Sequence, residues 1–251
     1  RIVVDNAAEL ERLAALAVQE GKTAQIYLRV TPGVEAHTHA FIRTGQIDSK
    51  FGLTLENGEA LAAAREALSL PGIDLKGFHC HIGSQIFDVD PFAHAADVML
   101  RFMARVRGET GATLTELNLG GGFGIRYTDR DQPKPFGAYM KQVSAVMSQT
   151  AAELDFPLII LEPGRSVAAP AGITLYTVGA VKSIPGVREY VSVDGGMGDN
   201  PRYALYKAAY TVVAANRMRE PNTRVMTISG RCCESGDLIQ ENVPLPDCEH
   251  G

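Results

Sequence analysis

The stretch LTELNLGGGFG, residues 114–124, holds the pattern that decides the fold of this chain. Its first six residues predict a short strand, and the glycines that follow predict a tight turn. Two other stretches repeat this order: LKGFHCHI (75–82) leads into GSQ, and PLIILE (157–162) leads into PGRS. Polar signatures thus follow three predicted strands, as active-site residues do at the carboxyl ends of parallel strands.

Helical segments separate the predicted strands. We expect further strands at 2–4 and 25–30, and helices at about 6–21, 58–69, 91–106 and 136–154. In the first helix Asn6 is placed as an N-cap, with Glu9 three residues later as in a capping box. Alternating strands and helices predict a parallel sheet with helices outside, in a (β/α)8 barrel or a doubly wound sheet. Only five strands are predicted, so a barrel requires three more strand–helix units before Arg1.

The pattern changes after Ser166. Short β-branched stretches, punctuated by glycine and proline, follow at 172–184, 188–196, 208–217 and 223–231. Such stretches predict a mainly β region. We therefore expect two domains: residues 1–166 form the barrel portion, and residues 167–251 form part of a β-rich domain that contributes to the active site.

Composition excludes several classes of function. The formal charge is −5 and no cluster of Lys and Arg is present, which disfavours nucleic acid as a partner. No apolar run approaches the roughly 20 residues that span a bilayer, so we expect no membrane segment. The four cysteines lack the spacing of a disulfide framework, which favours thiols and a cytoplasmic location.

Two of the glycine signatures allow more than one interpretation. GGGFG at 120–124 lets backbone N–H groups approach an anion, or it forms a tight turn that needs positive φ. Its spacing is not that of the dinucleotide fingerprint. In EPGRS at 162–166, Arg165 suits a phosphate or carboxylate and Glu162 suits a protonated ring nitrogen. The alternative is a structural Glu–Arg ion pair beside a proline turn.

The triplet His79–Cys80–His81 is not a good metal site. Strand alternation places the two histidines on one side and the cysteine on the other, so the three cannot converge on a zinc ion. The same geometry leaves Cys80 without a base as a nucleophile. His81 therefore either has a structural hydrogen-bonding role or stacks on a flat cofactor, with Ser84 and the preceding glycine near an anion.

Two further motifs lie in the β-rich region. SGRCCESGD (229–237) is either a polar turn or a proton-donating thiol, Cys233, beside the substrate-binding carboxylate of Glu234. In PRYALYKA (201–208), Arg202 and Tyr206 are four residues apart and share one face of a helical turn. An exposed amphipathic turn is the plainer interpretation.

Taken in this order, HIGSQ, LNLGGGFGI, EPGRS, PRYALY and CESGD resemble the fold-type III pyridoxal-phosphate decarboxylases. RVTPGVEAHTHAFIRTGQIDSKFGL at 29–53 is similar to the same family's stretch before its KFG motif. The resemblance covers nearly the whole chain. It implies the latter part of a (β/α)8 barrel followed by a mainly β, alanine-racemase-like C-terminal domain. It also implies pyridoxal 5′-phosphate as cofactor, no metal, and a homodimer with shared active sites.

The resemblance implies a role for each matched residue. His81 would stack on the pyridine ring, and Glu162 would keep the ring nitrogen protonated. The remaining cofactor-binding residues would be Ser84, Gly121, Gly122, Pro163, Gly164 and Arg165. Arg165, Arg202 and Tyr206 would hold the distal end of the substrate, and Glu234 would meet its distal ammonium. Cys233, supplied by the partner subunit, would return the proton after loss of CO2.

The resemblance is strongest to members that decarboxylate meso-diaminopimelate to L-lysine, the last step of lysine biosynthesis. A distal carboxylate requires arginine, whereas an ornithine pocket would need only acids there. The family's Schiff-base lysine and its late tyrosine have no match, so we expect a fragment that lacks both ends and turns over poorly as it stands. The alternatives are a decarboxylase of ornithine or arginine, or a non-catalytic regulatory protein of the same fold.

Overall fold

A computed structural model describes residues 1–34, 50–150 and 154–251. The chain divides into two compact units. The first contains Arg1–Ile125 and Gln132–Pro170, and the second contains Arg126–Asp131 and Ala171–Gly251. Most of the matched stretch 29–53, and the end of the helix predicted to reach 154, lie outside the described residues.

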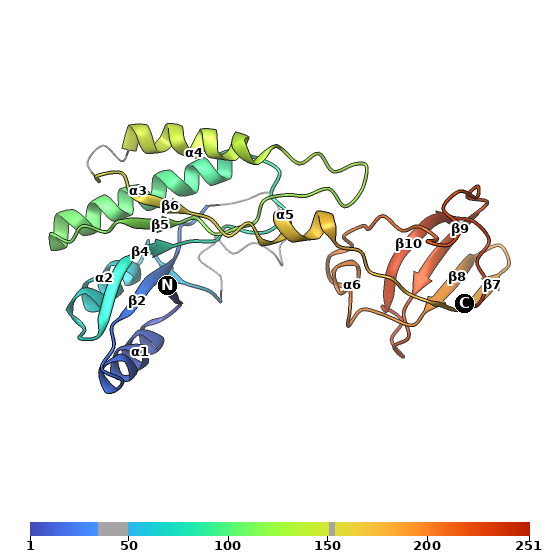
Figure 1. Cartoon of the computed structure of the whole chain (residues 1–251), viewed down its shortest axis with the longest axis horizontal. Coiled ribbons are helices and arrows are strands. Elements are labelled where there is room, and N and C mark those ends of the chain that lie inside the picture. Colours follow the sequence, from blue (N-terminus) through green and yellow to red (C-terminus); the bar gives the residue numbers. More distant parts are fainter. Residues whose placement is uncertain (35–49, 151–153) are drawn as a thin grey trace. The chain divides into compact units, whose positions relative to one another are not determined.

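The first unit is built on a parallel sheet (Figure 1). Its strands are β1 (Ile2–Val4), β2 (Ala24–Thr31), β3 (Leu53–Thr54), β4 (Ile73–His79), β5 (Glu116–Asn118) and β6 (Leu158–Ile160). They pair in the order β1-β2-β4-β5-β6, and the two-residue β3 also pairs with β2. This order follows the chain without the reversal that a doubly wound sheet requires. The predicted parallel sheet is confirmed, and its strand order is that of a barrel segment.

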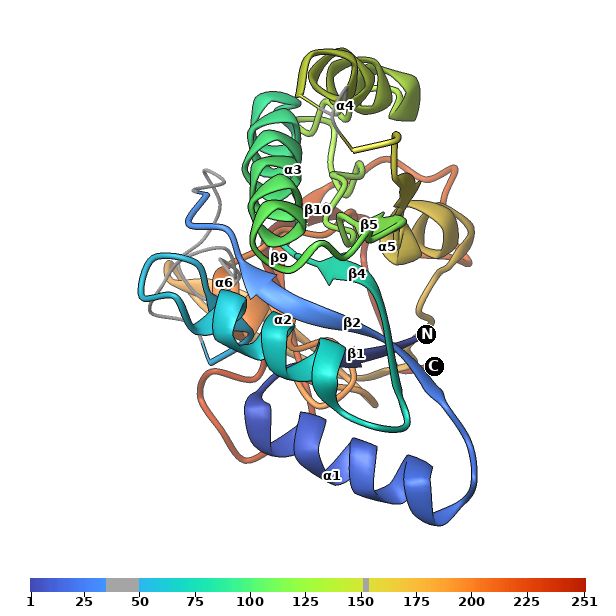
Figure 2. The ribbon, with the colours of Figure 1, turned by 90° about the vertical axis from the view of Figure 1, so that its left-hand side faces the viewer.

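Four helices separate these strands: α1 (Ala7–Gln19), α2 (Glu59–Ser69), α3 (Asp90–Thr110) and α4 (Phe136–Thr150). Figure 2 shows them along the outer side of the curved strand layer. The Asn6 side chain caps α1 by accepting a 2.9 Å hydrogen bond from the Glu9 N–H. The Glu9 carboxylate accepts from Asp5 N–H at 2.7 Å, one residue earlier than the standard capping box. The main apolar core lies between these helices and the sheet.

The strands before the glycine signatures end earlier than predicted. β4 ends at His79, not at residue 82, and β5 covers only 116–118. Beyond His79 the chain turns to the neighbouring glycine loop, where Ile86 N–H donates to the Gly122 carbonyl at 2.9 Å. After β6, the predicted turn at PGRS is instead the first part of a short helix, α5 (Gly164–Ala168).

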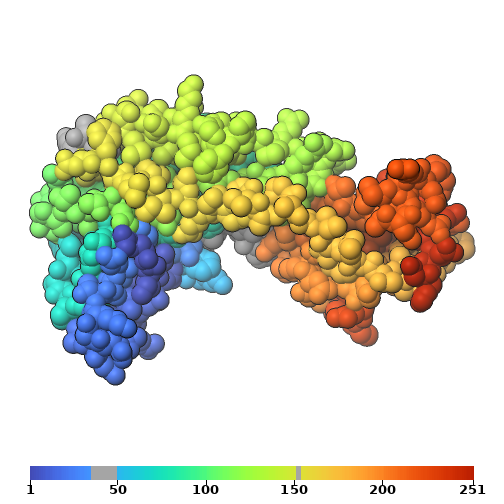
Figure 3. Space-filling view, viewed as in Figure 1, coloured from blue at the N-terminus to red at the C-terminus, as the bar shows by residue number. Residues whose placement is uncertain are grey.

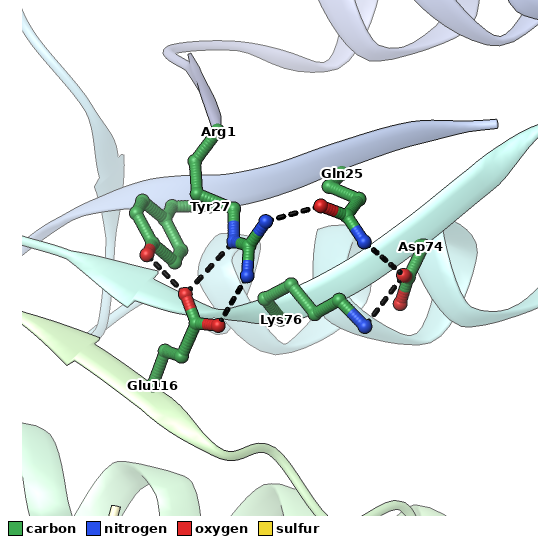
Figure 4. Close-up of polar contacts among 6 residues, drawn as sticks. All are labelled: Arg1, Gln25, Tyr27, Asp74, Lys76 and Glu116. Carbon is green, nitrogen blue, oxygen red and sulfur yellow. Dashed lines mark hydrogen bonds and ion pairs between the residues drawn. The ribbon is translucent and has the colours of Figure 1, made fainter. Parts of the chain in front are cut away.

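A polar network connects Arg1 with side chains on β2, β4 and β5 (Figure 4). Arg1 donates to both carboxylate oxygens of Glu116, at 2.9 and 2.6 Å, and Tyr27 also donates to that carboxylate. Tyr27, Gly77 and Glu116 are in register on β2, β4 and β5, so the tyrosine reaches its partner above a residue without a side chain. This network lies on the amino-terminal side of the glycine signatures, and Gly77 and Glu116 are two residues before the ends of β4 and β5.

The second unit is a four-stranded sheet of order β10-β9-β8-β7. Its strands are β7 (Val178–Ile184), β8 (Arg188–Val193), β9 (Arg224–Ser229) and β10 (Leu238–Leu245), and a helical turn, α6 (Arg202–Tyr206), precedes β9. Only the β8–β9 pair is parallel. The β-branched stretch 208–217 forms no strand, and Tyr210 N–H donates to the Gln240 side chain. No helix in the described ranges is long and apolar enough to span a bilayer.

Candidate active site

A cavity of about 320 Å³ opens at the carboxyl ends of the strands in the first unit. Its lining consists of Val3, Arg29, His79, His81 and Glu162. Arg29, His79 and Asn118 are in register on β2, β4 and β5. They lie two residues beyond the row Tyr27–Gly77–Glu116, and therefore project from the same face of the sheet. The cavity is thus built by neighbouring strands.

His81 is held as a neutral imidazole. Burial, followed by the nearby charges of Arg29 and His79, lowers its pKa from 6.5 to about 4. Its Nδ1 atom accepts a hydrogen bond from the Gly121 N–H at 3.3 Å, which leaves the proton on Nε2. At neutral pH the ring is therefore an uncharged flat surface.

His79 is buried, with only 4% of its surface exposed, and lies beside Glu162. Its Nε2 atom is 3.4 Å from Oε1 of Glu162. Burial lowers the pKa of His79 against the opposing attraction of the Glu162 carboxylate. Its Nδ1 atom is buried and has no hydrogen-bond partner among the described residues. A neutral His79 that donates from Nε2 leaves Nδ1 as a buried acceptor to which no described group donates.

Asn118 connects Glu162 to the glycine turn. Its amide nitrogen donates to Oε1 of Glu162 at 2.9 Å, and its amide oxygen accepts from the Gly120 N–H at 2.9 Å. The Glu162 N–H in turn donates to the Gly120 carbonyl at 2.9 Å. One side chain on β5 thus fixes both a carboxylate and the start of the GGGFG turn.

The glycines of this turn permit close backbone packing. A Cβ atom on Gly122, whose φ is +104°, would lie 2.2 Å from the Gly83 carbonyl oxygen. A Cβ atom on Gly121 would lie 2.3 Å from the Glu162 carbonyl oxygen. Any larger residue would push apart the loops that carry Ser84 and Glu162. The three signatures after β4, β5 and β6 therefore form one interlocked surface.

Gln85 ties the same three signatures together through its side chain. Its amide nitrogen donates to the Ile125 carbonyl at 2.7 Å, and its oxygen accepts from Ile125 N–H at 3.2 Å. The guanidinium of Arg165 lies 3.4 Å from that oxygen. Pro163 is the N-cap of the short helix α5, and Gly164 is its first residue.

The other predicted site residues lie in the second unit. Arg202 and Tyr206 are the first and last residues of α6. Cys233 and Glu234 are exposed on the loop between β9 and β10. That loop is held by Asp237, which is 2% exposed and accepts from Met197 N–H at 2.6 Å and Cys232 N–H at 2.7 Å.

Cys80 takes no part in either group. It is fully buried in the apolar core, and burial raises the pKa of its thiol to about 12. The thiol is therefore protonated and inaccessible at neutral pH. In the described parts of the chain, no group of three or more His, Cys, Asp or Glu side chains could hold a metal ion.

The same motifs define a known family. Residues 1–169 match the model described as pyridoxal-dependent decarboxylase, pyridoxal binding domain. The chain belongs to the pyridoxal-dependent decarboxylase family. The matched range contains every residue that lines the strand-end cavity, together with the glycine turn and the start of α5.

Relatives within this decarboxylase family are similar over the full chain. Diaminopimelate decarboxylases of Halalkalibacterium halodurans and Bacillus subtilis are 49% and 47% identical over 99% and 100% of it. The structure of diaminopimelate decarboxylase from M. jannaschii in complex with L-lysine has 34% identity and a TM-score of 0.86 over 99% of the chain. The chain spans 57% of the two bacterial relatives and 56% of the M. jannaschii protein.

Sequence reasoning missed three residues of this candidate site, Arg29, Gln85 and Asn118, and it gave no role to Asp237 in the second unit. Arg29, Gln85 and Asp237 contact residues that are distant in the sequence, and no local motif indicates such contacts. A signal was present for Asn118, since it immediately precedes LGGGFG at the end of a predicted strand. Gln85 is part of the HIGSQ motif, but its bonds to Ile125 and Arg165 appear only in the folded unit.

Proposed function

We propose that this chain is part of an enzyme that uses pyridoxal 5′-phosphate to decarboxylate meso-diaminopimelate to L-lysine. The observation that carries the proposal is the strand-end cavity, in which neutral His81 and the carboxylate of Glu162 face the same space. The substrate is inferred from the diaminopimelate decarboxylases that match nearly the full chain.

The residues of the cavity suit a pyridoxal group. His81 offers an uncharged ring face, and Glu162 is held in place by His79 and Asn118 as a partner for a protonated pyridine nitrogen. The buried, unpartnered Nδ1 of His79 and the adjacent Arg29 add polar groups to the same wall. Ser84, Gly121, Gly122 and the start of α5 would surround the phosphate. When bound, the cofactor supplies an electron sink for the carbon that loses CO2.

The substrate has two amino-acid ends, and the chain offers groups for the distal one. Arg202, with Arg165 and Tyr206, would bind the distal carboxylate, and Glu234 would bind the distal ammonium. The Nη1 atom of Arg202 is buried and has no hydrogen-bond partner in the described part of the chain. A carboxylate would satisfy this donor, whereas the side chain of ornithine would not.

We further propose that Cys233 donates the proton that replaces CO2, and that it does so in the active site of a second subunit. Cys233 and Glu234 are both exposed and hence accessible to a partner. Exposed apolar side chains of the second unit at Ile173 and Leu175 (85% and 71%) also support a homodimer, and the segment that carries them lies at the surface in Figure 3. All four cysteines are free thiols, which supports a cytoplasmic location.

The test is CO2 release by the full-length protein, loaded with pyridoxal 5′-phosphate. We expect release from meso-diaminopimelate and a much lower kcat/KM for ornithine and arginine. Preference for ornithine or arginine would overturn the substrate and leave the family unchanged. Cofactor binding without CO2 release from any of the three would favour a non-catalytic role.

A further inference from the structure

The guanidinium of Arg202 lies in a corner formed by two tyrosine rings. Its Cζ atom is 4.1 Å from the centre of the Tyr127 ring and 5.8 Å from that of Tyr210. The two rings are 5.8 Å apart and inclined at 83°. A cation over an aromatic face is attracted by the electron density of that face, so each ring contributes to holding the charge.

This aromatic corner is itself fixed by hydrogen bonds. The Thr211 hydroxyl donates to the Tyr127 carbonyl at 2.6 Å, which joins the segment of one tyrosine to that of the other. Tyr210 N–H donates to the Gln240 side chain on β10 at 2.9 Å. Residues 126–131 belong to the second unit although the chain on both sides of them belongs to the first. Tyr127 and Tyr210 therefore meet through the fold and are distant in sequence.

The helical turn that carries Arg202 is anchored from its other side. The hydroxyl of Tyr203, the next residue, donates to Glu241 on β10 at 2.6 Å, and Arg188 donates to the same carboxylate at 2.7 Å. With the backbone held by Tyr203 and the side chain lodged between two rings, the guanidinium has little freedom. Its Nη1 atom remains buried and without a partner among the described residues.

We propose that Tyr127 and Tyr210 are positioning residues that aim the Arg202 guanidinium at the distal carboxylate and so set the selectivity for substrates that carry one. The inference rests on the proposed function only for the identity of that carboxylate. Aromatic faces neutralise little of the arginine's charge, and they leave its Nη1 donor without a partner in the described parts of the chain. An acidic partner would orient the side chain equally well but would compete with the substrate.

Two ligands test this without turnover. L-lysine keeps the distal carboxylate of the substrate, and cadaverine is the same molecule without it. We expect Tyr127→Leu and Tyr210→Leu in the cofactor-loaded full-length protein to raise the Kd of L-lysine about tenfold and leave the Kd of cadaverine within about twofold. Tyr127→Phe keeps the ring face and should restore L-lysine binding to near the wild-type value.

Tyr190 supplies a matched control, since Arg188 lies over its ring at 5.7 Å in the same unit. Tyr190→Leu removes an aromatic contact of Arg188 but leaves the Arg188–Glu241 hydrogen bond that helps to anchor α6, so it should change neither Kd. An equal rise in the Kd of both ligands in the Tyr127→Leu and Tyr210→Leu proteins would show a merely structural role and overturn the inference. So would unchanged binding of both. If wild-type protein discriminates between the ligands but releases no CO2 from meso-diaminopimelate, the proposed function fails and the positioning role stands.

Discussion

His81 shows how burial adapts a common residue to a specific use. A protonated imidazole would repel Arg29 and would lose the hydrogen bond that Nδ1 accepts from Gly121. Burial prevents this by lowering the pKa to about 4, so the ring stays neutral over the range in which a free histidine titrates. The protein thus has an aromatic surface with a polar edge in a place where phenylalanine would leave Gly121 N–H without its acceptor.

The pH dependence of stability follows from this shift. Between 6.5 and about 4 the unfolded chain protonates His81 and the folded chain does not, so stability falls as pH is lowered through that range. From pH 7 to 5 we expect wild-type protein to lose about 2 kcal/mol more than His81→Asn, which lacks the titrating group. Denaturant unfolding at both pH values measures the difference. An equal loss of stability in the two proteins between pH 7 and 5 would show that His81 does not cause the pH dependence.

The two adjacent thiols make a second comparison at this scale. Hydrogen bonding to the Asp237 carboxylate raises the pKa of Cys232, which ties that residue to the loop. If Cys233 is the proton donor, Cys233→Ala in the full-length protein lowers kcat by about 10²-fold or more, whereas Cys232→Ala retains most of the activity. Steady-state kinetics with meso-diaminopimelate measures both. A larger effect at Cys232 would exchange the two assignments.

Pattern reasoning anticipated the residue scale only in part. Alternation correctly separates His79 and His81 from Cys80, because it depends on local backbone geometry that persists just past the end of β4. Arg29 and Asn118 could not be placed in this way. Arg29 reaches the cavity and Asn118 reaches Glu162 because β2, β4 and β5 pair in a register that aligns both residues with His79. Register is a property of the assembled sheet.

At the scale of elements, β4 and β5 can pair as closely as they do because residue 77 is a glycine. A Cβ atom there would lie 1.7 Å from the Glu116 carbonyl oxygen. We expect Gly77→Ala to destabilise the full-length protein by about 3 kcal/mol or more, since the strands would have to separate and the Tyr27–Glu116 hydrogen bond would be lost. Thermal and denaturant unfolding measure the change.

Gly108 on α3 is the matched control, because nothing lies within 4 Å of a Cβ atom added there. Alanine favours a helix interior over glycine, so Gly108→Ala should stabilise the protein by about 0.5–1 kcal/mol. If the two Gly→Ala changes alter the stability in opposite directions, the effect of strand packing is distinguished from that of backbone entropy. A mild effect at Gly77 would mean that β4 and β5 tolerate a wider spacing.

Helices and strands were predicted well where an apolar pattern repeats over many residues, and poorly where it covers only a few. α1, α2 and α3 were found because their apolar residues recur over several turns. β3, with two residues, and β10, which was not anticipated, carry too little pattern to be recognised. The stretch 208–217 contains β-branched residues but forms no strand. Val212 and Ala214 pack on the small β core, and composition alone cannot distinguish such packing from sheet pairing.

For the whole molecule, the parallel sheet ends in β1 and β6, which carry exposed apolar residues. Ile2 on β1 is 45% exposed and Leu158 on β6 is 64% exposed. Strand edges flanked by such residues associate with other chains. We expect residues 1–251 expressed alone to aggregate and to bind a hydrophobic dye, as checked by size-exclusion chromatography and fluorescence. A monodisperse preparation that melts cooperatively would contradict this.

Asp237 has a consequence for any exchange of loops in the second unit. Its carboxylate joins the stretch 194–199 to the stretch 230–237, and a Cβ atom on Gly196 or Gly230 would come within 2.8 or 2.2 Å of its oxygens. Replacing one stretch alone would leave the buried Asp237 carboxylate without one of its two backbone donors. The two stretches therefore have to be exchanged together, and Asp237 has to be kept with them.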